Sequence, residues 1–293
     1  MGGIAVGMVL LSAFIHASWN ILARHSRSES RFIGSMLPIV AAAALIPALI
    51  GQYLTGAMHG RIWLFVLGSG LCCGLYFVAL GRAYEAADFT VVYPVARSLP
   101  VLLVGLGDSL RGYVPSLGGW LGMVMVVVGC VMTPLRSRHD LQLGRYFNRA
   151  SLWMLITALG TVGYSLLDKR GAELLTRGPE YAAVYTYFFY LFALVGYELF
   201  TRLLGRPAVA ARKADTHKWM PAVAGFMSAG AYWLVVWAFQ MVSHASYVVA
   251  FRQSSLIIAL LMAWALYPQE RHRSRLLSVG IITAGLVLIA MGG

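Results

Sequence analysis

The sequence predicts an all-α membrane protein with ten transmembrane helices, arranged as two inverted five-helix repeats. Three observations predict this fold class: the composition, the lengths of the apolar runs, and a match between the two halves of the chain. Of the 293 residues, 59% are hydrophobic and 12% are charged, and the mean hydropathy is +0.73. A soluble domain carries about 25% charged residues, so a chain this apolar needs lipid as its surroundings.

Ten apolar runs have the length of a membrane span, since about 20 apolar residues cross the hydrocarbon core. They occupy residues 3–23, 31–53, 61–82, 89–109, 115–134, 150–169, 181–203, 218–240, 244–266 and 274–292. The connections are short except for 135–149 and 204–217, and neither of these is long enough to form a domain. We therefore expect a first repeat over 1–134, a linker over 135–149 and a second repeat over 150–293.

The two halves of the chain resemble each other at several polar positions. Residues 16–20 run parallel to 161–165, Tyr76 matches Tyr232, and Arg97 matches Arg252. Because each unit has an odd number of spans, a second copy in tandem enters the membrane upside down. The result is an inverted repeat, which in carriers places the solute site near the membrane midplane, between the halves.

The distribution of basic residues predicts the orientation in the membrane. The net charge is +12, and the connections after odd-numbered runs, with the run ends beside them, hold 16 Lys and Arg residues. The connections after even-numbered runs hold 5. Basic residues favour the cytoplasmic side, so both termini are predicted on the non-cytoplasmic side. Because the Lys and Arg residues lie in the connections between apolar runs, we interpret the positive net charge as an orientation signal. No nucleic-acid partner is therefore expected.

Arg97 and Arg252 are the strongest candidates for a binding site. Each lies near the centre of its apolar run, where a guanidinium costs at least about 2.5 kcal/mol on insertion scales. Such a residue normally faces a cavity, and guanidinium binds carboxylate or phosphonate oxygens in bidentate fashion. The pair therefore predicts a midplane site for an anionic or zwitterionic solute. The alternative is a structural role, in which each arginine caps carbonyls freed by Pro94 or Pro100, or pairs with Glu198.

Other polar and aromatic residues within the runs complete the predicted site. His16, Trp19 and Asn20 share one helix face, and His16 is the candidate for proton coupling because imidazole titrates near neutral pH. The alternative for His16 is a hydrogen-bonded packing role. The remaining predicted solute-binding residues are Tyr76, Tyr93, Tyr164, Tyr232, Trp233, Trp237, Gln240 and Gln253. For the stripe of Trp233, Trp237 and Gln240, packing is an equally good interpretation.

Prolines, cysteines and glycines carry further expectations. Pro94 and Pro100 predict a break or bend in the run 89–109 that acts as a gate. The three cysteines lie in apolar runs without metal-ligand spacing, so no metal or organic cofactor is expected. The motifs Gly70-x-x-x-Gly74 and Gly118-x-x-x-Gly122 predict close helix contact within the chain, although a homodimer is left open.

Two stretches resemble a known family. They are His16-Ala-Ser-Trp-Asn20, and the region from Leu80-Gly-Arg-Ala-Tyr84 through Asp88 to Ser98. In these the chain resembles the EamA-type ten-helix branch of the drug/metabolite transporter superfamily, and it looks most like members associated with phosphonate-utilisation genes. The resemblance implies movement of metabolites, proton-coupled or facilitated, through a cavity lined by spans 1, 3, 4, 6, 8 and 9. Several relatives have cytoplasmic termini, which disagrees with the charge count; for this chain we follow the count.

We therefore expect a secondary carrier of a small polar metabolite in a bacterial inner membrane, working by alternating access. One alternative is an exporter of aromatic or cationic compounds bound by the Trp and Tyr faces. Another is an intramembrane serine protease built on Ser69 and His244, which needs the two within hydrogen-bond reach. The last is a membrane sensor that transports nothing. No motif for an enzyme class appears, so we predict that the chain is not an enzyme.

Overall fold

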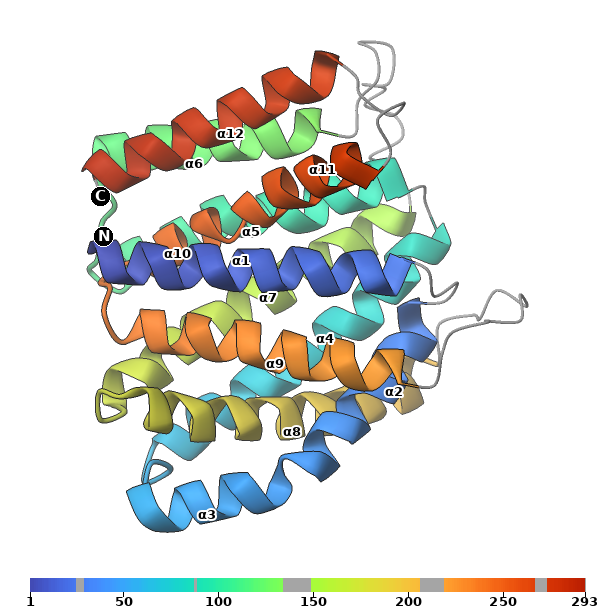
Figure 1. Ribbon diagram of the computed structural model, residues 1–293, viewed down its shortest axis with the longest axis vertical. Coiled ribbons are helices and arrows are strands. Elements are labelled where there is room, and N and C mark those ends of the chain that lie inside the picture. The colour runs from blue at the N-terminus through green and yellow to red at the C-terminus, as the bar shows by residue number, and fades with distance from the viewer. Residues whose placement is uncertain (25–28, 87–88, 134–148, 206–218, 267–272, 293) are drawn as a thin grey trace.

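The computed structural model describes residues 1–24, 29–86, 89–133, 149–205, 219–266 and 273–292, and these residues form helices and no strand (Figure 1). The side chains of Asn20, Tyr93 and Pro94 lie outside the described part. Twelve helices occur in the described residues. They are α1 (Gly3–Arg24), α2 (Glu29–Ala43), α3 (Leu45–Thr55), α4 (Ile62–Ala86), α5 (Phe89–Leu110), α6 (Leu117–Met132), α7 (Arg149–Leu174), α8 (Pro179–Leu204), α9 (Met220–Phe239), α10 (Ala245–Phe251), α11 (Ser254–Leu266) and α12 (Arg273–Gly292).

Two of the predicted runs are interrupted, and neither is the one that carries Pro94 and Pro100. The helices α2 and α3 meet at a bend of 49° beside Ala44. The second interruption separates α10 from α11 at Arg252 and Gln253. By contrast, α5 continues across both prolines, so a break is not observed there, and the alternative of a bend that acts as a gate stays a prediction. Prolines are tolerated within membrane helices when neighbouring groups satisfy the freed carbonyls.

By length and composition, five helical segments of the described chain are able to cross a membrane. They are Ile62–Ala86, Ser151–Leu174, Pro179–Leu204, Met220–Phe239 and Ala245–Met262, and the last runs across α10 and α11. The bent pair α2–α3 makes a sixth if it counts as one span, and Gly3–Trp19, Leu117–Met132 and Leu276–Gly292 are shorter apolar helices. A multi-span helical protein is therefore observed. Helix length and composition do not establish ten spans or an inverted repeat, and both stay predictions.

Helix α4 lies between α7 and α8, and small residues make this close packing possible. A Cβ added to Gly70 would lie 2.4 Å from Cβ of Phe192, and one added to Gly74 would lie 2.4 Å from N of Tyr197, both on α8. On the other side of α4, a Cβ at Gly163 of α7 would lie 2.7 Å from Sγ of Cys72. The predicted use of the first Gly-x-x-x-Gly motif in packing within the chain is confirmed.

The second glycine motif joins α6 to α12 in an antiparallel pair. A Cβ at Gly122 would lie 2.6 Å from O of Gly285, and Gly118 lies beside Gly292 at the end of α12. The two helices run side by side at one edge of the bundle, and both chain termini lie at the same end (Figure 1). This end also carries the start of α10, because the backbone N–H of Ser116 donates to Oη of Tyr247 over 3.2 Å.

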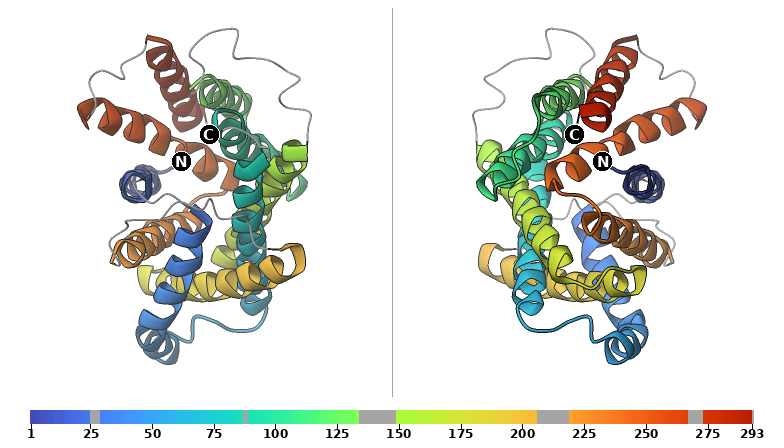
Figure 2. Two further views of the ribbon diagram at one scale, coloured as in Figure 1. Left: turned by 90° about the vertical axis from the view of Figure 1, so that its right-hand side faces the viewer. Right: turned by 90° about the vertical axis from the view of Figure 1, so that its left-hand side faces the viewer.

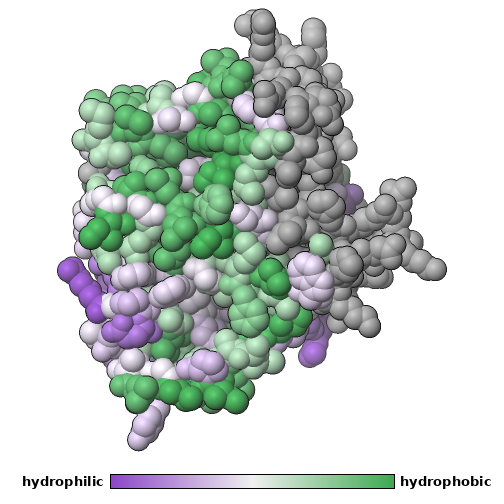
Figure 3. Space-filling view, viewed as in Figure 1, coloured by the Kyte–Doolittle hydropathy of each residue, from purple (hydrophilic) through white to green (hydrophobic). Residues whose placement is uncertain are grey.

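The outer faces of the helices are apolar, as lipid contact requires. On α6, the side chains of Leu117, Leu121, Val124 and Val128 are exposed and follow one helix face. On α7, Leu152, Leu155 and Leu159 form a similar stripe. The face seen in Figure 3 is largely hydrophobic over α1, α11 and α12. Exposed apolar area this extensive marks a surface that contacts lipid or another apolar partner.

Candidate functional site

A small internal cavity brings the two predicted arginines together. It has a volume of about 30 Å³ and lies between α4, α5, α7 and the interruption between α10 and α11. Figure 2 shows the arrangement of these helices along the bundle. Its lining consists of Tyr76, Ala96, Arg97, Thr161, Tyr164, Val249, Arg252 and Gln253. A volume of this size holds about one or two water molecules. Five of the predicted binding residues are among the eight that line it.

Arg97 reaches the cavity from α5 and contacts the start of α11. Its Nη2 donates to Oγ of Ser255 over 2.6 Å, and the arginine side chain is half-buried. Ser255 belongs to the first turn of α11, directly after the interruption. The contact therefore ties a helix of the predicted first repeat to the interrupted helix of the second.

Arg252 enters the same cavity from the interruption itself. Around it the backbone N–H of Gln253 bonds O of Ala250 at 2.9 Å, and N–H of Leu256 bonds O of Gln253 at 2.9 Å. These tight three-residue turns replace the α-helical pattern at the join. The Arg252 guanidinium carbon lies 5.4 Å from the centroid of the Tyr232 ring, a cation–π contact. In the described part of the chain, no carboxylate pairs with Arg252 at ion-pair distance.

Tyrosine rings extend from the cavity toward α8 and α9. The rings of Tyr76 and Tyr164 are 6.0 Å apart and nearly perpendicular, and those of Tyr164 and Tyr232 are also 6.0 Å apart. Phe189 of α8 stacks on Tyr232 with the centroids 4.4 Å apart. Edge-to-face and stacked pairs of this kind stabilise a fixed ring arrangement. The cavity wall on this side is therefore aromatic, with hydroxyl groups at its edge.

Gln253 supplies an unpaired hydrogen-bond acceptor. Only 4% of the residue is exposed, and its Nε2 donates to O of Val249 over 3.2 Å in the preceding turn. Its Oε1 has no hydrogen-bond partner in the described part of the chain. A buried amide oxygen without a partner is costly, and in a native protein it asks for a water or a ligand.

Other predicted residues lie away from the cavity. Trp233 donates its indole N–H to O of Pro179 over 2.7 Å, and Trp237 stacks on Trp233 at 6.0 Å. Gln240 accepts from N of Gly178 at 3.1 Å and donates to O of Thr176 at 3.2 Å. These contacts hold the turn between α7 and α8. A solute-binding role for this stripe stays a prediction that the geometry does not support.

The residues predicted on α1 form a pair of their own. Trp19 donates its indole N–H to Nδ1 of His16 over 3.2 Å, and the two rings meet edge to face at 5.2 Å. Neither residue is among those that line the cavity. The side chains of Asn20 and Tyr93 lie outside the described part of the chain, so their roles in solute binding stay predictions.

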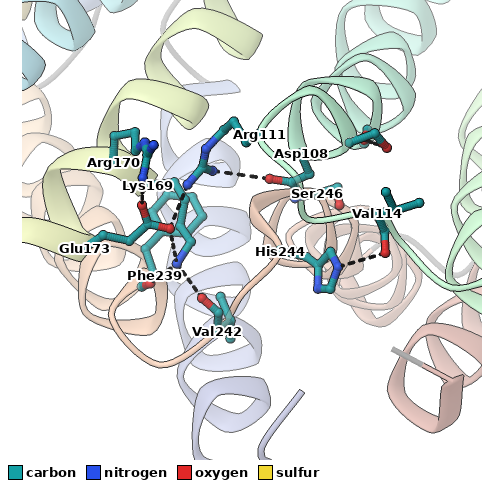
Figure 4. Close-up of polar contacts among 12 residues, drawn as sticks. Asp108, Arg111, Val114, Lys169, Arg170, Glu173, Phe239, Val242, His244 and Ser246 are labelled. Carbon is teal, nitrogen blue, oxygen red and sulfur yellow. Dashed lines mark hydrogen bonds and ion pairs between the residues drawn. The ribbon is translucent and has the colours of Figure 1, made fainter.

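An ion cluster near one end of the bundle was not predicted from the sequence. Glu173 of α7 accepts from Arg111 of α5 at 2.6 Å, from Lys169 at 3.2 Å and from Arg170 at 3.0 Å (Figure 4). Arg111 also lies 3.4 Å from Oδ1 of Asp108. We name these five residues the terminal ion cluster. The sequence analysis gives none of the five a role in a site.

The terminal ion cluster is bonded to the backbone of two further elements. Lys169 donates from Nζ to O of Phe239 over 2.8 Å and also to O of Val242. The other Asp108 oxygen accepts from N of Ser246 over 2.8 Å, at the start of α10. Helices α5, α7, α9 and α10 are thus joined by these contacts (Figure 4), at the end of the bundle that carries the chain termini (Figure 1).

A second buried carboxylate also escaped the sequence prediction. Asp168 of α7 is 0% exposed, although it lies one residue from the end of the run 150–169. Tyr185 of α8 donates to its Oδ1 over 2.8 Å, and Tyr232 of α9 donates to its Oδ2. The signal in the sequence is an Asp inside an apolar run, since an ionisable residue within a membrane span is normally functional. Its position close to the end of the run makes this signal weak, because side chains at the ends of spans usually contact water.

The serine and histidine of the protease alternative are separated. Ser69, inside α4, donates to O of Tyr164 over 3.4 Å. His244 precedes α10, with its Nε2 3.4 Å from O of Val114 and its ring 4.5 Å from that of Tyr247 (Figure 4). The hydroxyl and the imidazole therefore have different partners, and no catalytic pair forms between them. The expected absence of a cofactor stays a prediction.

Apolar outer faces and several helices of membrane-spanning length define the class: a multi-pass membrane protein. Within this class the chain belongs to the sugar transport protein family, whose model matches residues 23–293, so it is a transporter. It is also similar to an uncharacterized transporter encoded in the cobO 3′ region of a Sinorhizobium species, with 30% identity over 95 residues, 32% of this chain and 67% of the relative. A solved crystal structure superposes on 98% of this chain and 97% of its own, with a TM-score of 0.70. At 16% identity it supports the fold alone.

Proposed function

We propose that this transporter is a secondary carrier of a small polar metabolite, anionic or zwitterionic, that works by alternating access around the arginine-lined cavity. One observation carries the proposal: Arg97 and Arg252 line a single cavity, although 155 positions separate them in the sequence. Two guanidinium groups in a site of low dielectric constant attract an anionic group strongly. The acceptor Oε1 of Gln253 suits a donor group elsewhere on the solute, such as an ammonium or a hydroxyl.

The proposal includes a membrane arrangement of ten spans in two inverted repeats. On this view α2–α3 and α10–α11 are each one interrupted span, and the short helices α1, α6 and α12 cross as well. Interrupted spans at a midplane site are typical of secondary carriers, where they provide a hinge. The proposed location is a bacterial inner membrane, and the termini are proposed on the non-cytoplasmic side, as the count of basic residues predicts.

Movement is required because the cavity is too small for a metabolite. A volume of about 30 Å³ holds water, whereas small-molecule sites measure roughly 300–1,000 Å³. The terminal ion cluster closes the bundle at the end with the termini, so we propose that it acts as a gate on that side. Opening at one end requires the other end to close, which is how alternating access prevents a leak.

A neutral sugar is the second candidate solute. The description of the family favours it, and the tyrosine hydroxyls and Gln253 suit a molecule rich in hydroxyl groups. Aromatic faces beside hydrogen-bonding groups are typical of small-molecule sites. The two arginines argue for an anionic group on the solute in addition, and they oppose the exporter of cations, since two positive charges repel a cation.

Counterflow in proteoliposomes separates these candidates. Proteoliposomes that contain the purified protein are loaded with unlabelled L-malate, L-serine, 2-aminoethylphosphonate, D-glucose or choline. The entry of the same compound, labelled and added outside, into the proteoliposomes is then followed. Entry of malate, serine or the phosphonate supports the proposal. Entry of glucose alone favours the neutral sugar, entry of choline alone favours the exporter, and no entry of any compound contradicts the proposed carrier for this panel.

A further inference from the structure

Asp168 is a buried carboxylate that the proposed binding of a solute does not use. It is 0% exposed, and the hydroxyls of Tyr185 and Tyr232 donate to its two oxygens. No Lys, Arg or His in the described part of the chain lies within ion-pair distance of it. The neighbouring Lys169 points to Glu173 and to carbonyls at the end of α9. The carboxylate thus has hydrogen-bond donors but no counter-charge in direct contact.

This environment supports both protonation states of Asp168. Two tyrosine O–H donors stabilise the anion, because hydrogen bonds to a carboxylate favour its charged form. Burial without a paired cation favours the neutral acid. A tyrosine hydroxyl is both a donor and an acceptor, so after rotation it accepts a bond from the protonated carboxyl. The site therefore keeps a hydrogen bond to each carboxyl oxygen in both protonation states.

Tyr232 connects Asp168 to the solute cavity. Its hydroxyl donates to Asp168, and its ring face lies 5.4 Å from the guanidinium carbon of Arg252, which lines the cavity. A second connection runs through Tyr164, whose ring is 6.0 Å from that of Tyr232 and which also lines the cavity. The charge of Asp168 therefore acts on Arg252 through one intervening side chain.

We propose that Asp168 is the proton-binding site that couples solute movement to a proton gradient. The proton binds to a carboxylate oxygen of Asp168 from water on one side of the membrane and leaves to water on the other side, once for each solute molecule. This inference rests on the proposed carrier function and deepens it by naming the coupling ion and its site. It replaces His16, whose Nδ1 accepts the indole N–H of Trp19 and loses that bond on protonation.

The charges explain why proton and solute move together. With Asp168 ionised, Arg97, Arg252 and Asp168 together carry one positive charge. When one proton and one monoanionic solute are both bound, the sum is again one positive charge. With only the anion bound, the anion lies in the same low-dielectric region as the ionised carboxylate of Asp168, and the two negative charges repel each other. Protonation of Asp168 and binding of an anion therefore favour each other, which couples the two.

Among the described residues, Arg252 is the charged group that acts on Asp168, and the other groups that act on it are uncharged. Helix α4 contributes Ser69, Cys72 and Cys73, α8 contributes Tyr185, and α9 contributes Tyr232. Arg252 acts from the interruption between α10 and α11. The carboxylate oxygens already receive hydroxyl hydrogens, which suits a proton better than a sodium ion, because a metal ion needs lone pairs directed toward it.

The test compares Asp168→Asn with Tyr190→Phe in proteoliposomes, using a compound of the panel above that exchanges with wild-type protein. Asn mimics the protonated acid, so we expect counterflow within a few fold of wild type and complete loss of accumulation driven by an inward proton gradient. Tyr190 is the matched control, because its hydroxyl bonds Oγ of Ser228 at 2.8 Å and not Asp168. Tyr190→Phe should accumulate the compound as wild type does.

Two further measurements keep the test decisive. In wild-type protein, a solute gradient should drive proton entry, reported by a trapped pH dye. Net solute entry without proton entry, or accumulation that follows a sodium gradient, overturns the proposal. Infrared difference spectra between acid and alkaline pH should show a carboxylic-acid band that Asp168→Asn removes and His16→Gln keeps; this needs only the proton as probe. If no compound exchanges, the carrier proposal fails, while the infrared result still decides whether Asp168 binds a proton.

Discussion

Arg111 of α5 donates to Glu173 of α7 over 2.6 Å, and this ion pair joins the two halves of the chain near the end of the bundle that carries the termini. The arginine side chain is 13% exposed and the glutamate 21%, so water screens the pair only in part. Glu173 also neutralises Lys169, which is nearly buried. Loss of this one carboxylate therefore leaves three positive charges close together, with Asp108 as the one remaining carboxylate of the cluster.

Glu173→Gln should open the bundle at this end. Repulsion among Arg111, Lys169 and Arg170 favours separation of α5 from α7, so water and small reagents should reach the cavity more often. Cys72 is a suitable reporter, because it lies one helical turn before Tyr76 of the cavity wall. In a background where the other cysteines are alanine, labelling of Cys72 by a membrane-impermeant maleimide should become severalfold faster.

Glu180→Gln is the matched control for this labelling experiment. Glu180 is an exposed carboxylate in the first turn of α8 and lies at the same end of the bundle. Its substitution should leave the labelling rate unchanged. Equal rates in Glu173→Gln and wild type would show that the terminal ion cluster does not control access.

Close packing of α4 on α8 predicts a stability difference between two glycine substitutions. At Gly74, a Cβ would lie 2.4 Å from N of Tyr197 and 2.5 Å from C of Gly196, and backbone cannot move aside easily. Gly74→Ala should destabilise the protein by about 1–3 kcal/mol, the usual cost of overpacking. Gly280→Ala on α12 meets nothing within 4 Å and should leave Tm unchanged or raise it. Thermal unfolding in detergent measures both, and equal Tm values would argue against the α4–α8 contact.

The two buried glutamines should respond in opposite ways to substitution by leucine. Gln240 makes two hydrogen bonds to the turn between α7 and α8, so Gln240→Leu should lower stability by about 1–3 kcal/mol. Gln253 has an unpaired Oε1, so Gln253→Leu should leave stability unchanged or higher while raising the KM for solute. Unfolding curves and counterflow kinetics on the same preparations separate the effects. A Gln253→Leu carrier with wild-type KM would remove Gln253 from the site.

Much of the helical framework could be predicted from apolar runs alone. The run 61–82 corresponds to α4 and the run 181–203 to α8, because a long apolar stretch in lipid has few alternatives to a helix. The position of Arg97 and Arg252 at one cavity could also be predicted from the sequence, because the two residues occupy equivalent positions in the two halves. Whether they bind solute stays a prediction.

What the sequence did not reveal depends on contacts between distant segments. Asp168 becomes a buried site only because Tyr185 and Tyr232 reach it from two other helices. The interruption at Arg252 and Gln253 contains no proline, whereas α5 stays helical across two prolines. Local propensity therefore pointed to the wrong run, since tertiary packing decides which interruptions are stable.

The central claim is that Arg97 and Arg252 together bind the solute, and counterflow with single substitutions tests it most directly. Hydrogen bonds to charged groups contribute about 1.5–3 kcal/mol, so Arg97→Ala and Arg252→Ala should each weaken solute binding roughly tenfold to a hundredfold. Arg202→Ala, at an exposed position in the last turn of α8, is the control and should behave as wild type. Loss of counterflow in both cavity variants, with unchanged unfolding temperatures, is the predicted result. Wild-type counterflow of an anionic or zwitterionic solute in either variant would contradict the account.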